Sequence, residues 1–123
     1  MILIVDDSPD TCRVLQKLLE HGGYQTQCVS GAAEAMEFVR AVTPSVIVLD
    51  DMMPIRTGVE LLEDLKADAR LSHIPVVMYS ACQDEERVQQ ALRMGAVEWL
   101  CKGRTTWSQL LGRIARLHDH DAA

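Results

Sequence analysis

Four acidic residues follow two apolar segments of the sequence, and this repeated arrangement favours divalent-cation chemistry. Asp6 and Asp7 come directly after one segment, and Asp50 and Asp51 come directly after another. Because carboxylates held close together repel one another, a cation is expected among them. Mg²⁺ prefers oxygen ligands and typically binds one or two carboxylates together with waters and a phosphate. A single aspartate would more often cap the helix that follows it, but a doublet after the first segment together with an aspartate after the second favours a magnesium site.

Two further residues extend this chemistry to phosphoryl transfer. Ser80 and Lys102 also stand at the ends of apolar segments, where they offer a hydroxyl and an ammonium group. A carboxylate nucleophile, a metal, a hydroxyl and a lysine form a set that can attack phosphorus and neutralise charge on its equatorial oxygens. Taken alone, Ser80 would be a helix cap and Lys102 a solvated lysine. The prediction therefore depends on all of these groups meeting at one edge.

The groups meet only if strands and helices alternate along the chain. Five apolar, largely β-branched segments predict strands, at residues 2–5, 26–29, 46–49, 74–79 and 97–101. Helical spacing predicts five helices between and after them, which begin near Pro9, Ser30, Thr57, Asp84 and Thr105. Ser8 before Pro9 is a typical N-cap, and Thr57 with Glu60 forms a capping-box pattern. Strict alternation predicts βαβ units and a parallel sheet.

The polarity of the segments predicts the order of the strands. Residues 2–5, 46–49 and 74–79 are nearly continuous apolar segments, as expected of strands covered on both faces. The more polar segments 26–29 and 97–101 belong at the edges. The predicted fold is α/β: a flavodoxin-like, doubly wound, five-stranded parallel sheet of order 2-1-3-4-5, with five helices. Ligands bind such a sheet at the carboxyl ends of the first and third strands, where the aspartate doublets stand.

Composition limits the class of protein. A length of 123 residues fits one domain, and 48% hydrophobic residues can form its core. The formal net charge of −6 argues against direct nucleic-acid binding, which needs a basic surface. No uncharged stretch is long enough to span a membrane, and the N-terminus lacks the basic region of a signal peptide. We therefore expect a cytoplasmic domain, with an unstructured polar tail at residues 118–123.

The cysteines predict no covalent framework. Cys12, Cys28, Cys82 and Cys101 are widely spaced and include no CxxC pair. That spacing argues against a zinc site or a disulfide framework and predicts reduced thiols. We expect Cys82 and Cys101 to be small packing residues.

The motifs together resemble the response-regulator receiver domain of two-component signalling, in the manner of a single-domain chemotaxis regulator. The residues that carry this resemblance are Asp6-Asp7-Ser8-Pro9, Asp50-Asp51-Met52-Met53-Pro54 with Gly58, Ser80-Ala81, Trp99 and Lys102. The resemblance covers residues 1–117, which are therefore expected to form the receiver domain. Whether the sequence is a stand-alone regulator or an N-terminal domain stays open.

The resemblance implies roles for the acidic residues. Asp50 is expected to accept a phosphoryl group from a histidine kinase or a phosphotransfer protein. Asp7, Asp50 and the backbone carbonyl of Met52 are expected to bind Mg²⁺, while Asp6 acts through a water molecule.

The resemblance also implies a switch. Ser80 is expected to move to the phosphoryl group, Lys102 to bind it, and Trp99 to be the switch aromatic that turns inward. This movement would remodel the surface of the last two helices and the last strand, which would bind a downstream protein or a second copy of the chain. Trp99 as an edge-strand aromatic with one fixed rotamer is the alternative.

Departures from the family pattern lie beside these residues. Gly103 replaces the usual proline after the lysine, so we expect a trans Lys102–Gly103 peptide, a positive φ at Gly103 and a less firmly aimed lysine. Ser80 replaces the commoner threonine. Met52 and Cys82 occupy the positions that flank the path of attacking water in the family, which affects the lifetime of the phosphoryl group.

Two other functions are alternatives to a phosphorylated receiver. A receiver-like interaction module would work without phosphorylation, but the set of Asp7, Asp50, Ser80 and Lys102 is intact. An aspartyl-phosphate hydrolase would need an additional cap or substrate-recognition region, for which 123 residues leave no room. We therefore expect a phosphoacceptor with at most self-phosphorylation and self-dephosphorylation activity, not an enzyme.

Overall fold

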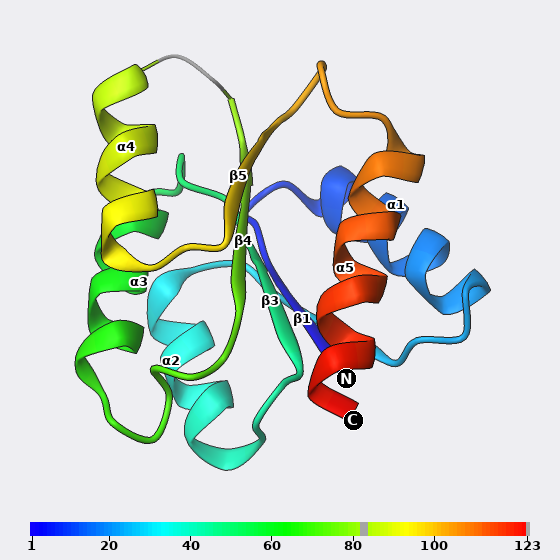
Figure 1. The fold of residues 1–123 in the computed structure, drawn as a ribbon, viewed down its shortest axis with the longest axis horizontal. Coiled ribbons are helices and arrows are strands. Elements are labelled where there is room, and N and C mark those ends of the chain that lie inside the picture. Colours follow the sequence, from blue (N-terminus) through cyan, green and yellow to red (C-terminus); the bar gives the residue numbers. More distant parts are fainter. Residues whose placement is uncertain (82–83, 123) are drawn as a thin grey trace.

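The computed structural model describes residues 1–81 and 84–122, with side chains through residue 119. Strands and helices alternate as predicted (Figure 1). In chain order they are β1 Ile2–Val5, α1 Pro9–His21, β2 Thr26–Val29, α2 Ala32–Ala41, β3 Val46–Leu49, α3 Gly58–Ala67, β4 Val76–Ser80, α4 Glu85–Met94, β5 Glu98–Cys101 and α5 Trp107–Ala122. The packing prediction for Cys82 lies outside the described residues.

The five strands form one parallel sheet of order β2-β1-β3-β4-β5, which confirms the predicted topology. Every residue of β1, β3 and β4 is buried, whereas β2 and β5 are mostly half-buried edges. The register pairs Val5 of β1 with Leu49 of β3. Because these partners end their strands at the same level, the residues that follow them emerge side by side.

Helices cover both faces of the sheet. Figure 1 shows α2, α3 and α4 on one side and α1 and α5 on the other. The first layer contributes Leu61 and Ala91 to one hydrophobic core, and the second contributes Leu15 and Ile114 to another. Burial of these two apolar layers is the main stabilising contribution to such a domain.

Local capping interactions fix where the helices begin. The Ser8 side chain accepts a hydrogen bond from the Thr11 N–H, and Thr57 and Glu60 form the predicted capping box. Asp84 caps α4, which ends at Gly95 in the left-handed region with φ of 109°. The caps of α1 and α3 fix where the loops after β1 and β3 end. These two loops carry the aspartates that follow the strands.

The end of the chain differs from the sequence-based expectation. We expected an unstructured tail from His118, but α5 continues to Ala122. Nδ1 of His118 lies 2.7 Å from Oγ of Ser45, and its ring packs edge-on against Tyr24 at a centroid distance of 5.0 Å. Ser45 in turn donates to the carbonyl of Met1, so the two termini lie close together (Figure 1). These tertiary contacts stabilise the last turn of α5, although the sequence of that turn has no apolar pattern.

The turn after β5 has the predicted conformation. The described residues contain no cis peptide bond, and Gly103 has a φ of 84°. Without a proline, a trans bond before residue 103 avoids the cost of a cis peptide, about 2.5–4 kcal/mol, and glycine tolerates the positive φ.

None of the helices in the described ranges is long and apolar enough to cross a membrane.

The start of α3 packs directly on the backbone of Asp50. A Cβ atom at Gly58 would collide with the carbonyl oxygen of Asp50 and come within 2.9 Å of Cα of Asp51. We predict that Gly58→Ala lowers the free energy of unfolding by about 3 kcal/mol, because neither backbone can move aside cheaply.

The matched control for this substitution is Gly112→Ala in α5, where a Cβ meets no atom within 4 Å. There alanine should raise the free energy of unfolding by about 0.5–1 kcal/mol, because it favours the helix. Urea unfolding of the two variants tests both expectations. Equal effects would contradict the packing argument.

Candidate functional site

Three of the four acidic residues form a cluster at the carboxyl ends of β1 and β3. One carboxylate oxygen each from Asp6, Asp7 and Asp50 lies within 4.8 Å of the others. Asp6 and Asp50 are buried, with 3% and 4% exposure, while Asp7 is exposed. Three oxygen ligands at this spacing, open to solvent on one side, fit a hard divalent cation such as Mg²⁺.

Burial disfavours the ionised form of the Asp50 side chain. Desolvation raises the pKa of Asp50, and the nearby charge of Asp6 raises it further. Hydrogen bonds from Ser80 and the Met52 N–H, with the charge of Lys102, lower this pKa but do not cancel the rise. A cation bound among these carboxylates would favour the ionised form and so oppose the effect of burial.

Ser80 connects the two aspartates at the end of β3. Its hydroxyl donates to Oδ1 of Asp50 at 2.6 Å and accepts from the N–H of Asp51 at 3.2 Å. The side chain is fully buried at the end of β4. The hydroxyl is therefore already in contact with the carboxylate of Asp50, the residue predicted from the sequence to accept the phosphoryl group.

Lys102 reaches the same cluster from the end of β5. Its Nζ lies 2.8 Å from Oδ2 of Asp6 and 3.6 Å from Oδ1 of Asp50, so the shorter contact is with Asp6. Burial alone would lower the pKa of Lys102, but its hydrogen bond to Asp6 and the charges of both carboxylates raise it overall. The lysine therefore stays protonated and supplies one positive charge among three carboxylates.

Asp51 points away from the cluster and has a separate cationic partner. Nε and a terminal nitrogen of Arg87 in α4 bind its two carboxylate oxygens at 2.7 and 2.8 Å. The N–H of Val59 donates to the same carboxylate at 3.0 Å. Asp51 thus anchors α4 and the start of α3 to the end of β3. Arg87 could not be identified from the sequence, because no local pattern relates it to a residue 36 positions earlier.

Trp99 lies in β5 opposite Met78 of β4 and packs against the core beneath α3 and α4. Its Nε1 is buried and has no hydrogen-bond partner within the described part of the chain. Met52, by contrast, is 60% exposed in the loop after β3. The indole of Trp99 therefore packs against the core, whereas the Met52 side chain is exposed to solvent.

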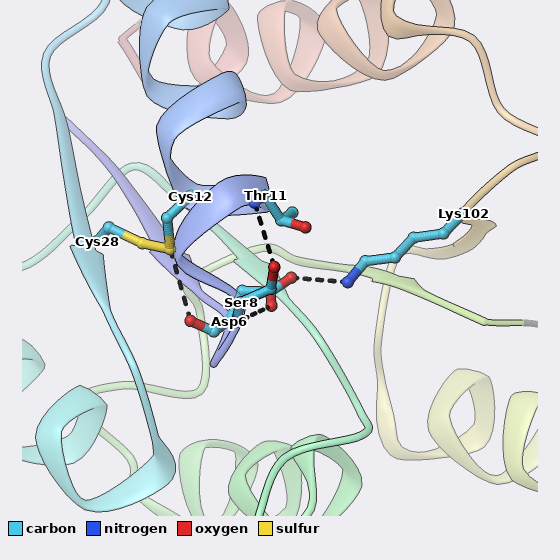
Figure 2. The surroundings of a disulfide bond; sticks show 6 residues. All are labelled: Asp6, Ser8, Thr11, Cys12, Cys28 and Lys102. Carbon is cyan, nitrogen blue, oxygen red and sulfur yellow. Dashed lines mark hydrogen bonds and ion pairs between the residues drawn. A yellow bond between two sulfur atoms is a disulfide. The ribbon is translucent and has the colours of Figure 1, made fainter.

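The prediction of reduced thiols is wrong for this structure. Cys12 in the first turn of α1 and Cys28 in β2 form a disulfide, and no described cysteine is a free thiol. Their Cα atoms are 6.1 Å apart, within the range that a disulfide spans. The sequence could not indicate this pair, because the βαβ crossover brings the two residues together. Figure 2 shows the disulfide on one side of Asp6 and Lys102 on the other.

Comparison with known proteins agrees with this geometry. The response regulator receiver domain family matches residues 2–114. This chain belongs to that family. It is a receiver domain of two-component signalling, built on the flavodoxin-like fold that the family shares.

Relatives of this receiver domain are similar over most of its length. The response regulator DivK of Brucella ovis is 34% identical over 72% of this chain and 75% of its own. The signal receiver domain of a histidine kinase from Syntrophus aciditrophicus has a TM-score of 0.89 and 34% identity, covering 97% of this chain and 89% of that one.

Other relatives are much longer than this receiver domain. Hybrid signal transduction histidine kinase D of Dictyostelium discoideum is 31% identical over 95% of this chain. The chain spans only 7% of that kinase, and 53% of the response regulator MtrA of Mycolicibacterium smegmatis.

We predict that Arg87→Met lowers the free energy of unfolding by about 1–3 kcal/mol, because it leaves the buried Asp51 carboxylate without its cation. Arg13→Met is the control, since it removes an exposed pair with Asp10 and should cost less than about 0.5 kcal/mol. Urea unfolding measures both. If Arg87→Met were as mild as Arg13→Met, the pair with Asp51 would not be an anchor.

Proposed function

We propose that Asp50 is the phosphoacceptor of this receiver domain and that a histidine kinase or phosphotransfer protein is its donor. The observation that carries this proposal is the double contact of one oxygen, Oδ1 of Asp50, with the Ser80 hydroxyl and the Lys102 ammonium. In the reaction a carboxylate oxygen of Asp50 attacks phosphorus, and the bond from phosphorus to the donor breaks. Lys102 and Ser80 then neutralise and bind the transferred oxygens.

We infer that the acidic cluster holds Mg²⁺, which when bound neutralises charge on the phosphoryl oxygens. Asp7, Asp50 and the backbone carbonyl of Met52 would be its direct protein ligands. Asp7 is exposed, while Asp6 is buried and already accepts hydrogen bonds from Lys102 and the Ser8 N–H. For that reason we assign Asp6 a contact through water.

The output of this reaction is a change of surface, not turnover of a substrate. We propose that the domain has no activity beyond self-phosphorylation and self-dephosphorylation, and that it works in the cytoplasm. Ser80 and Trp99 would couple phosphorylation to the face formed by α4, β5 and α5. That face would bind a downstream protein or a second copy of the chain, without direct contact to nucleic acid or membrane.

The phosphoacceptor is tested by intact mass after incubation with acetyl phosphate and Mg²⁺. The unmodified protein should gain one phosphoryl group. The Asp50→Asn variant should gain none, because its side-chain amide cannot form the acyl phosphate. Asp10→Asn, an exposed aspartate in α1, should react at the unmodified rate. Phosphate gain by Asp50→Asn at that rate would exclude Asp50 as the acceptor.

Metal binding is tested by titration calorimetry with Mg²⁺. Asp7→Ala should weaken the affinity by more than about tenfold, because it removes a charged direct ligand, whereas Asp6→Ala should have a smaller effect. Asp10→Ala serves as the charge-matched control and should bind as the unmodified protein does. Unchanged affinity in Asp7→Ala would remove Asp7 from the ligand set.

The switch is tested by amide hydrogen exchange with beryllium fluoride as phosphoryl mimic. Protection should change more in α4, β5 and α5 than in α1 and α2, and Ser80→Ala should reduce this difference, because it removes the hydroxyl that would move. A uniform change across all helices, or a response unaffected by Ser80→Ala, would contradict this route.

A further inference from the structure

The disulfide between Cys12 and Cys28 lies next to the acidic cluster. Asp6 and Asp7 line one open cavity of about 420 Å³ together with both cysteines. Sγ of Cys12 lies 3.5 Å from the backbone carbonyl oxygen of Asp6 (Figure 2). Because a disulfide sulfur carries no proton, this is a van der Waals contact in the oxidised protein. The disulfide and the candidate cation site thus line the same cavity.

We propose that Cys12 and Cys28 form a redox site that reacts with dithiols, and that its oxidation state sets the divalent-cation affinity of the acidic cluster. The inference rests on the function proposed for Asp50 and its neighbours, which it extends with a means of regulation. In the cytoplasm, which is proposed above for this domain, a disulfide is usually transient, catalytic or redox-sensing, and this favours a regulatory bridge over a permanent one.

The two cysteines differ in exposure, and this sets the order of the reaction. Both line the open cavity, but Cys28 is half-buried on an edge strand, whereas Cys12 is only 9% exposed. A thiolate of the dithiol attacks Sγ of Cys28, the bond between the cysteines breaks, and Cys12 leaves as a thiolate that takes up a proton. The second thiol of the reagent then releases Cys28 as a thiol, and the reagent leaves as a disulfide.

Reduction acts on the loop that carries Asp6 and Asp7. In the oxidised form the bridge ties the first turn of α1 to β2, which pairs with β1 along its whole length. Breaking the bond moves the sulfurs apart by roughly an ångström or more, from bonded to non-bonded distance. Cys12 then also gains a proton that it can donate to the Asp6 carbonyl. A less constrained loop loses more conformational freedom when its carboxylates bind a cation, so the affinity falls.

The test compares Mg²⁺ affinity of the full chain in its oxidised form and after reduction with dithiothreitol, by titration calorimetry. Peptide mapping without reductant first verifies the bridge between Cys12 and Cys28. Reduction should weaken Mg²⁺ binding on the order of tenfold, as for other residues that orient metal ligands. It should also raise amide exchange in residues 6–12 without metal, a readout independent of phosphorylation.

The control is the double variant Cys12→Ser and Cys28→Ser, which keeps the other two cysteines. It should bind Mg²⁺ like the reduced protein, and dithiothreitol should change its Mg²⁺ affinity by much less than the tenfold expected of the unmodified chain, because only the bonding of Cys101 is left to reduce. Equal affinity of the oxidised and reduced unmodified chain, or a dithiothreitol response of the double variant as large as that of the unmodified chain, would overturn the inference. The comparison of unmodified forms stands even if the variant folds poorly.

Phosphorylation of Asp50 separates this inference from the function on which it rests. If both redox forms gain one phosphoryl group and bind Mg²⁺ equally, the redox inference fails while the phosphoacceptor assignment stands. If neither form gains phosphate although reduction weakens Mg²⁺ binding, the phosphoacceptor assignment fails and the redox site stands.

Discussion

Crowded negative charge at the ends of β1 and β3 is the constraint on which the rest of this domain depends. Asp6, Asp7 and Asp50 bring oxygens within 4.8 Å of one another, two of them from buried side chains. One lysine cannot neutralise three carboxylates, and burial already raises the pKa of Asp50. A divalent cation bound among these oxygens would stabilise their charged forms, and the arrangement could hold such an ion.

The second aspartate at the end of β3 has a different role, because successive residues there point in different directions. Asp50 joins the acidic cluster, while Asp51 turns to Arg87 and the N–H of Val59. Ser80 contacts both, through the carboxylate of one and the N–H of the other. Asp50, the proposed phosphoacceptor, is thus connected to α4 by a short chain of hydrogen bonds, and α4 belongs to the face proposed to change on phosphorylation.

Local sequence signals were sufficient for most of the fold. The Ser8 cap, the Thr57 capping box and the glycine at residue 95 mark helix ends through interactions within a few residues. The rank of the strands by polarity predicted the order of the sheet, because central parallel strands are apolar on both faces. That order in turn placed the acidic residues of β1 and β3 together, since parallel strands of similar length end at one edge.

The sequence alone therefore determined the fold class, the family motifs and which strand ends meet, because these follow from periodicity and topology. Only the tertiary structure decided which side chains pair. Arg87 binds Asp51, Cys12 joins Cys28, and His118 extends α5 through its contacts with Ser45 and Tyr24. Each of these pairs joins residues distant in sequence, and the packing of a helix against the sheet sets their separation. No local pattern encodes that distance, so only the folded chain reveals it.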